Sequence, residues 1–249
     1  MSAPSSLPAA TLAQAAMELR LTARRGENVL VTVFIPAVVL VFFASTGVLP
    51  TPSGRPVDFL LPGSMALAVM ATSLVNLGIA TAYERHYGVL KRLGGSPLTR
   101  GGLLAAKVAA VLVVELGQIA LLVAIAVFVL GWSPASGVNP ALLAGVVLLG
   151  TGAFAGLGLL LAGALRAEAT LALANALFIA AMLLGGIILP LDHLPDPLAG
   201  VAGVLPAAAL SDAFRAALGV DLDPVRPLAI LFAWAVGSIA IAARTFRWE

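Results

Sequence analysis

The sequence predicts an all-α polytopic membrane protein with six transmembrane helices, and two observations support this fold class. First, 61% of the 249 residues are hydrophobic and only 10% are charged, with a mean hydropathy of +1.07, whereas a soluble domain carries about 25% charged residues. Second, the apolar residues form long continuous runs rather than the alternating pattern of a transmembrane β-barrel. This composition argues against a soluble enzyme.

Each predicted span is an apolar run of about 20 residues, the length that crosses a bilayer. Pro50 closes the first run, and the turn-forming stretch 131–140 closes the third. Arg166 and Glu168 separate the fourth run from the fifth, which is predicted to stop at Pro190. The spans form one transmembrane domain, 28–249, after a cytoplasmic segment, 1–27. The predicted spans are 28–48, 62–83, 102–130, 141–165, 169–189 and 227–243.

Residues 8–25 are predicted to form an amphipathic interfacial helix. At helical spacing, Leu12, Ala16, Leu19 and Ala23 fall on one face, and the charged residues fall mainly elsewhere. Such a helix would lie along the cytoplasmic membrane surface. A simple positively charged anchor before the first span is an equally good explanation. The segment does not have the order of a secretory signal peptide, in which basic residues precede an apolar core and a cleavage site.

The distribution of Lys and Arg predicts that both termini are cytoplasmic. With six crossings, eleven of the fourteen basic residues belong to the side that carries the termini, and an excess of Lys and Arg marks the cytoplasmic side. High usage of Ala, Gly, Pro and Arg is typical of a GC-rich bacterial genome, so we expect a bacterial plasma membrane. The eleven are Arg20, Arg24, Arg25, Arg85, Lys91, Arg92, Arg100, Lys107, Arg166, Arg244 and Arg247.

The sequence lacks the motifs of nucleotide-hydrolysing and intramembrane enzymes. A phosphate-binding loop needs a Gly-rich turn followed by Lys and then Ser or Thr, but Lys91 is followed by Arg92, and Lys107 by Val108. The two His residues lie in different predicted loops and there is no Cys, which leaves little for a metal site. We therefore expect no catalytic residue, no metal or cofactor bound by this chain, and no nucleic-acid partner.

The predicted cytoplasmic loop 83–100 contains a short, partly apolar helix. Val89, Leu90 and Leu93 belong to this helix, a Gly pair ends it, and Pro97 restarts the chain toward the third span. A partly apolar helix exposed to the cytoplasm would fit the groove of a partner protein. An ordinary basic hairpin loop beside lipid headgroups is the alternative.

A long outer segment, 185–219, is cut by Pro residues into pieces too short to cross a membrane. Its apolar stretches have the length of re-entrant or interfacial helices. They would cap the outer end of a transport path or rest on the membrane surface.

The cytoplasmic loop and the outer segment together resemble one known family. In the loop, Glu84 closes the second span, Gly88-Val89-Leu90 and Leu93 follow, and Pro97-Leu98-Thr99-Arg100 restarts the chain. The outer segment contains, in order, Gly186, Pro190, Leu194-Pro195, Leu205-Pro206, Asp212, Arg215 and Gly219. This combination is similar to the permease subunit of type-2 ABC exporters, the daunorubicin-resistance-like family that includes polysaccharide and teichoic-acid exporters. The resemblance covers essentially the whole chain.

The resemblance implies a half-transporter that receives its energy from another chain. A coupling helix in the loop would dock on a separate ABC nucleotide-binding subunit, which would hold ATP and Mg, and a second permease chain would complete the path. The missing phosphate loop agrees with this division independently. The resemblance assigns coupling to Glu84, Arg85, Gly88, Val89, Leu90, Leu93 and Pro97, and the outer re-entrant segment to Pro190, Pro195, Pro206, Asp212 and Arg215.

Four polar residues inside the spans are candidates for a substrate path. Glu115 is the one acid deep in a predicted span, and Gln118 follows three residues later on the same face. A charge at such depth costs at least ~2.5–3.5 kcal/mol, which makes Glu115 a functional candidate for a cationic substrate or a proton. The alternative is hydrogen bonding between helices, with Gln118, Asn76 or Asn175 as partner.

Small residues recur in the fourth predicted span. Gly152 and Gly156 form the close-packing pattern, which marks a helix interface within the subunit or between two subunits.

The best-supported function is export of a hydrophobic or amphiphilic substrate, such as a drug, lipid or glycolipid. The apolar spans favour such a molecule, because a highly charged solute would need more buried polar groups along its path. Two alternatives fit the same sequence: a proton-coupled secondary transporter that uses Glu115, and a non-transport membrane assembly protein.

Overall fold

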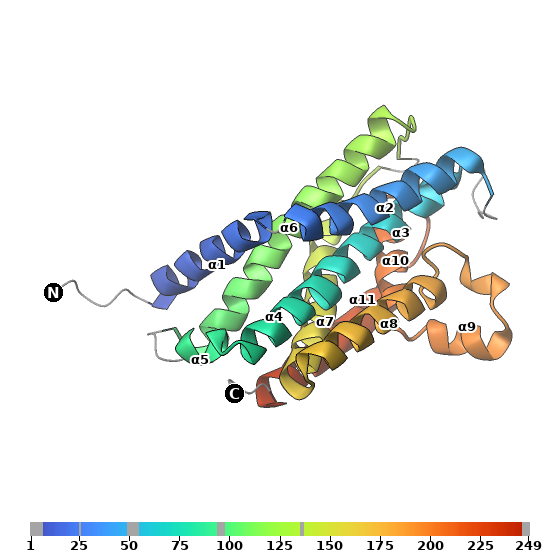
Figure 1. The fold of residues 1–249 in the computed structure, drawn as a ribbon. Helices are drawn as coiled ribbons and strands as arrows, with labels where there is room; N and C mark the ends of the chain where they lie inside the picture. The colour runs from blue at the N-terminus through green and yellow to red at the C-terminus, as the bar shows by residue number, and fades with distance from the viewer. Residues whose placement is uncertain (1–6, 25, 49–54, 94–97, 135–136, 246–249) are drawn as a thin grey trace.

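The computed structural model describes residues 7–24, 26–48, 55–93, 98–134 and 137–245. In this part of the chain all regular structure is helical, which confirms the predicted fold class. The helices form an elongated bundle (Figure 1). Their bounds are α1 Leu7–Arg24, α2 Gly26–Thr46, α3 Pro56–Met70, the π-helical turn η1 Ala71–Asn76, α4 Leu77–His86, α5 Val89–Leu93, α6 Arg100–Phe128, α7 Pro140–Ala164, α8 Ala167–Leu184, the 3-10 turn η2 Leu191–His193, α9 Asp196–Ala202, α10 Pro206–Ala217 and α11 Val225–Thr245.

Five helical stretches of the described chain are long and apolar enough to cross a membrane. A sixth crossing is formed if α9 and α10, bent by 74° relative to each other, count as one broken span. The first predicted span corresponds to α2, which has 21 residues, and the apolar stretch assigned within its described side chains is Thr32–Thr46. The exact number of six therefore stays a prediction. The five long stretches are Pro56–His86, Gly101–Phe128, Pro140–Ala164, Ala167–Leu184 and Val225–Arg244.

Two predicted boundaries are wrong by several residues. The second span begins at Pro56 rather than at 62, because Pro at the first helical position is well tolerated and Pro62 lies inside the helix. The fifth span ends at Leu184 rather than at 189. There the pair Gly185-Gly186 ends the helix, and Gly186 adopts a left-handed φ of 61° that favours glycine.

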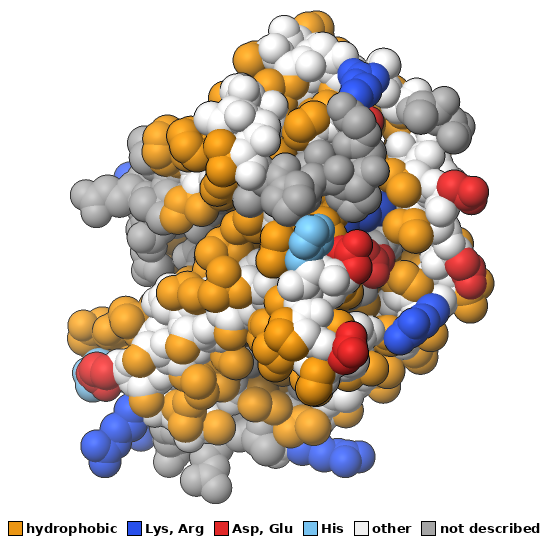
Figure 2. Space-filling view, turned by 90° about the vertical axis from the view of Figure 1, so that its right-hand side faces the viewer, with side chains coloured by type: hydrophobic (Ala, Val, Ile, Leu, Met, Phe, Trp, Pro, Cys, Tyr) orange, Lys and Arg blue, Asp and Glu red, His pale blue; other side chains and the backbone are white. Residues whose placement is uncertain are grey.

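The helix α3–η1–α4 is the centre of the bundle. Almost every residue of α3 is buried, in contact with α2, α6, α7 and α10. At the periphery, α8 and α11 expose large apolar side chains such as Ile179 and Phe232. Figure 2 shows one face of the molecule, on which hydrophobic side chains are spread widely and charged side chains lie mainly along the right-hand side and the lower edge. Such a surface is suited to lipid or to another membrane chain.

The close-packing pattern of α7 faces α11 of the same subunit. A Cβ built on Gly156 would lie 2.8 Å from the Ser238 Cβ, and one on Gly152 would lie 3.3 Å from the Ala235 Cβ. The Ser238 hydroxyl also donates to the Ala153 carbonyl at 3.1 Å. Of the two interfaces that the sequence left open, this pattern therefore forms the one within the subunit.

Arg215 joins the end of α8 to α10 in the outer segment. Its guanidinium donates to the Gly186 carbonyl, pairs with Asp212 at 2.6 Å and lies 4.3 Å from the centroid of the Phe59 ring. The Ser211 hydroxyl donates to the Gly185 carbonyl at 2.8 Å. These contacts hold the Gly pair against the bundle. After it, each of the next three helices begins at a Pro residue or directly after one. Pro190 precedes η2, Pro195 precedes α9, and Pro206 begins α10.

Candidate functional site

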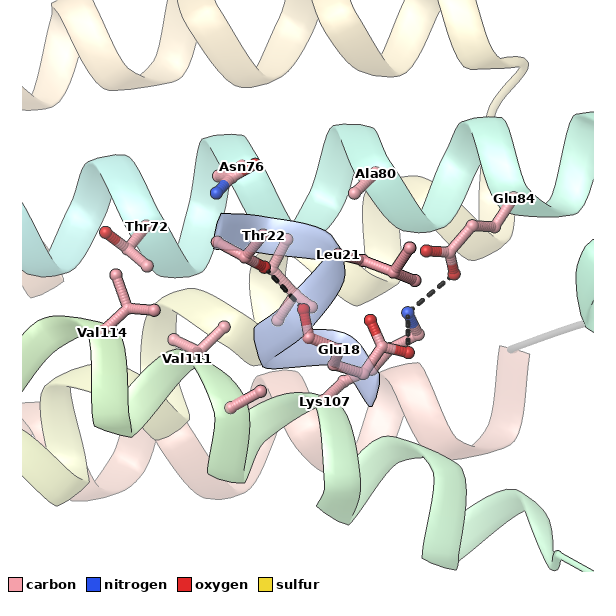
Figure 3. Close-up of a pocket in the computed structure, with 12 residues that line it drawn as sticks. Glu18, Leu21, Thr22, Thr72, Asn76, Ala80, Glu84, Lys107, Val111 and Val114 are labelled. Atoms are coloured by element: carbon pink, nitrogen blue, oxygen red, sulfur yellow. Dashed lines mark hydrogen bonds and ion pairs between the residues drawn. The ribbon is translucent and has the colours of Figure 1, made fainter. Parts of the chain in front are cut away.

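A buried ion-pair triad joins three helices near one end of the bundle. Lys107 lies on α6 with only 1% of its side chain exposed, and its Nζ lies 2.9 Å from the Glu18 carboxylate of α1 and 2.6 Å from the Glu84 carboxylate of α4. Figure 3 shows the two carboxylates converging on the ammonium group. We call this cluster the Lys107 triad. Because a buried ammonium group is costly without partners, the two acids stabilise it there.

The Lys107 triad lies at the end of the bundle that carries α5. The start of α1, α5 and the end of α11 all lie toward this end, which we call the loop end (Figure 1). The α1 helix packs along α6. Its predicted apolar face, including Leu12 and Ala16, is exposed, while Ala15 and Glu18 face the bundle. The helix thus turns its more polar side to the protein and its apolar side outward, as an interfacial helix would.

A small cavity lined by both polar and apolar side chains lies between α1, α4 and α6, next to the Lys107 triad. Its volume is about 40 Å³, which is room for about three water molecules. Figure 3 shows Glu84, Ala80, Asn76 and Thr72 following one another along one side of the central helix. The lining is Glu18, Leu21 and Thr22 of α1, Thr72 and Asn76 of η1, Leu77, Ala80 and Glu84 of α4, and Lys107, Ala110, Val111 and Val114 of α6.

Beyond the cavity, Glu115 is the centre of a second polar cluster. It is fully buried, and the hydroxyls of Ser73 on η1 and Thr151 on α7 both bond to its carboxyl group. The Thr72 hydroxyl donates to the Gln118 side-chain oxygen at 2.9 Å. The cluster therefore bridges the central helix, α6 and α7. Glu115 bonds to Ser73 and Thr151 rather than to the partners expected from the sequence, which were Gln118, Asn76 and Asn175.

The π-helical turn η1 positions Thr72, Ser73 and Asn76. A π turn places an extra residue in the helix and is frequent at functional sites. The facing helix allows this shape, because Gly158 of α7 comes so close that a Cβ there would lie 2.8 Å from the Ser73 carbonyl oxygen and 2.9 Å from that of Leu74. The π turn and this glycine together place two hydroxyl-bearing residues beside α6.

The segment predicted to couple to a partner is anchored to the bundle by its own side chains. The Arg85 guanidinium donates to the carbonyls of Gly163 and Leu165 at the junction of α7 and α8. Gly88 adopts a left-handed φ of 68° between α4 and α5, and Leu90 is fully buried in a cluster with Leu103 and other apolar residues.

These positions change the assignment of individual coupling residues. The sequence places Leu90 among the partner contacts, but its buried side chain cannot reach a protein docked on the outside of α5. Glu84 and Arg85 also point to partners inside the subunit. Leu93 is partly buried against the same apolar cluster, Val89 is exposed, and Pro97 lies outside the described residues. The exposed side chains at α5 are Tyr87, Val89, Lys91 and Arg92.

The other intramembrane candidates lie apart from one another. Asn76 lines the cavity, whereas Asn175 lies on the exposed face of α8 and donates to the Leu171 carbonyl of its own helix at 2.8 Å. At the far end, Pro190, Asp212 and Arg215 line an outer cavity of about 400 Å³.

The sequence interpretation missed the Lys107 triad. One signal could have indicated it: Lys107 lies seven residues inside α6, where the surrounding sequence is apolar, so it needs an acidic partner. Glu18 and Glu84 are among the few acids on the predicted cytoplasmic side. The pairing itself joins residues 89 and 23 positions apart, a distance that periodicity cannot bridge.

The sequence matches the ABC-2 type transporter family over residues 11–218, from α1 to the end of α10. This range contains all three residues of the Lys107 triad, the Glu115 cluster and α5. The chain belongs to the ABC-2 type transporter family. It is therefore a multi-pass transmembrane component of an ABC transporter and is not itself the catalytic subunit. No curated protein matches the sequence.

Proposed function

We propose that this ABC-2 family chain is the permease of an ATP-driven exporter and that a separate nucleotide-binding subunit, carrying ATP and Mg, docks on α5. The observation that carries the proposal is the construction of α5. Leu90 fixes the helix to the bundle, while Tyr87, Val89 and Arg92 remain exposed. Aromatic and Arg side chains are the residues enriched in protein interfaces.

The anchors of this segment would transmit a displacement of α5 into the bundle. Arg85 connects the end of α4 to the junction of α7 and α8, and Glu84 connects it through Lys107 to α6 and α1. Closure of the ATPase subunits would therefore act on several helices at once. The excess of Lys and Arg at the loop end supports a cytoplasmic location for this end and both termini, in the plasma membrane of a bacterium.

The docking proposal predicts that acidic substitutions on α5 and in the turn before it weaken binding of the ATPase. We expect the Tyr87→Asp, Val89→Asp double variant to bind a co-expressed ABC ATPase subunit at least about tenfold more weakly, because buried aromatic contacts dominate interface energies. Co-purification and the ATPase activity of the complex measure this. Val201→Asp is the matched control, since Val201 is 57% exposed on α9 at the far end. Equal binding by the double variant and the control would contradict docking on α5.

We further propose that a second copy of the chain packs on α8. This helix exposes Leu171, Ile179 and Leu183, and between them lies the exposed amide of Asn175. A polar amide facing hydrocarbon is unfavourable, whereas polar side chains between membrane helices form hydrogen bonds. A facing helix from a second copy would meet this requirement.

Cross-linking tests this arrangement directly, because the native chain contains no Cys. Under mild oxidation in membranes, we expect Asn175→Cys to form a disulfide-linked dimer. The control Ile239→Cys, on the exposed face of α11 where Ile239 is 49% exposed, should remain monomeric. Dimers from the α11 variant, and none from the α8 variant, would place the interface on α11 instead.

The expected substrate is a drug, a lipid or a glycolipid. Two almost wholly apolar cavities lie beside α7, one of about 260 Å³ against α11 and one of about 180 Å³ toward α8 and α10, and Trp234 and Leu157 line both. Apolar cavities of this kind suit an acyl chain or a ring system and offer no hydration to a charged solute.

A further inference from the structure

Polar side chains lie at intervals between the loop end and Glu115, with Ala80 as an apolar residue among them. Glu18 and Glu84 are each about 13% exposed and mark the outer mouth of the cavity, while Asn76 and Thr72 line its inner part (Figure 3). Thr72 bonds to Gln118, and its neighbour Ser73 bonds to Glu115. A helix in a membrane does not require such a row of polar groups, so the row needs an explanation.

Gln118 carries an unpaired donor and is joined to the cavity through Thr72, although Gln118 itself does not line the cavity. The Gln118 side-chain nitrogen is buried and has no hydrogen-bond partner, although its oxygen bonds to Thr72 on the cavity wall. Buried donors in native proteins are nearly always satisfied, by protein or by ordered water. Half of the residues that line the cavity are polar, and its volume of about 40 Å³ admits water molecules.

Around Glu115 there are fewer hydrogen atoms than hydrogen-bond acceptors. The Ser73 hydroxyl lies 2.8 Å from the Val69 carbonyl oxygen, and the Thr151 hydroxyl lies 2.7 Å from that of Val147, while both also bond to Glu115. Each hydroxyl has a single hydrogen. The two hydroxyl hydrogens therefore face four acceptor oxygens, two of the backbone and two of the carboxyl group. A proton on the carboxyl group would supply a third hydrogen for these contacts.

The surroundings of Glu115 offer no other counter-charge. In the part of the chain that the structure describes, Glu115 forms no ion pair, and no group of acids and His suited to a metal is found. The groups that face it from η1, α6 and α7 are hydroxyls and an amide. The nearest charges on the polar row are those of the Lys107 triad.

We propose that the cavity is a water-filled route through which Glu115 exchanges a proton with the loop end of the bundle. In this step the O–H bond of the carboxyl group breaks, its electron pair stays on the carboxyl oxygen, and the proton passes to a water molecule that connects the carboxyl group to the cavity; the reverse step restores the acid. The two carboxylates of the Lys107 triad exceed its single ammonium and favour a cation at the mouth. The proposal concerns this chain alone, so its test does not depend on whether an ATPase docks on α5.

Infrared spectroscopy of the full chain in lipid nanodiscs tests both that Glu115 is protonated and that its proton exchanges through the cavity. The difference spectrum between the native protein and Glu115→Gln at neutral pH should contain the carbonyl stretch of a protonated carboxylic acid. In D₂O this band should shift to lower frequency, and Asn76→Leu, which fills the route, should slow the shift. The control Val113→Leu, at a position 54% exposed on α6, should leave the rate unchanged. A missing acid band, or a band that keeps its frequency in D₂O, would overturn the proposal.

A second measurement leaves Glu115 intact and covers the case in which Glu115→Gln does not fold. Single cysteines at Asn76 and Val113 can be exposed to silver ions, which are small enough to follow water and bind thiolates. Labelling of the remaining thiol after denaturation measures the reaction. We expect Asn76→Cys to react faster than Val113→Cys, and only when silver is added at the loop end. Equal rates at both positions, or reaction from the far end, would contradict the route.

Discussion

Replacing Lys107 by Met should destabilise the protein by about 3–5 kcal/mol, the usual cost of leaving a buried charge without its partner. The Glu18 and Glu84 carboxylates now lie 2.9 Å and 2.6 Å from one ammonium group. Without it, two acids of like charge would converge on an apolar side chain. At about 2–4 °C per kcal/mol, the melting temperature should fall by on the order of 10 °C. Thermal unfolding in detergent, followed by tryptophan fluorescence, measures the change.

A charge-neutral control separates electrostatics from packing. The triple variant Lys107→Met, Glu18→Gln, Glu84→Gln removes all three charges and keeps the approximate volume, so it should recover most of the lost stability. The single variant should also release α1, which the triad ties to α6, and make it sensitive to protease. If Lys107→Met melts like the native protein with α1 protected, the triad does not hold these helices together.

The helical class and the approximate spans could be predicted because they depend on local composition. Continuous apolar runs specify membrane helices wherever they occur, and the predicted span 102–130 agrees with α6 within two residues at each end. The predicted start of the second span and the predicted end of the fifth were wrong because a local rule was applied at the wrong residue. Pro62 has the character of a helix start, but Pro56 holds that place, and the Gly pair at 185 ends α8 before Pro190 can.

The site could be predicted only in part, because its chemistry depends on contacts between distant residues. The depth of Glu115 is visible in the sequence, but its partners Ser73 and Thr151 come from two other helices. The sequence also predicts the short helix at 89–93, yet periodicity cannot tell that Leu90 faces inward and Tyr87 outward. The π turn cannot be predicted from a local pattern either, and Gly158, which packs against it, lies on another helix.

The second large effect is expected at Gly158, where even one methyl group has no space. A Cβ at this position would lie 2.8 Å and 2.9 Å from the carbonyl oxygens of Ser73 and Leu74. Backbone atoms cannot rotate away as a side chain does, so Gly158→Ala must push α7 from the central helix. Overpacking of this kind typically costs about 1–3 kcal/mol.

The displacement should also reach the Glu115 cluster, because Thr151 lies two turns before Gly158 on the same face of α7. Its hydroxyl would then be drawn from the carboxyl group, and the acid band proposed for Glu115 should change frequency together with the loss of melting temperature. Gly145→Ala is the matched control in the same helix, since a methyl group there would meet no atom within 4 Å, and Ala is favoured over Gly in a helix by about 1 kcal/mol. If both alanine variants melt alike and leave the infrared band unchanged, close contact with Gly158 does not shape η1, and the geometry of the cluster must depend on the hydrogen bonds of Glu115 alone.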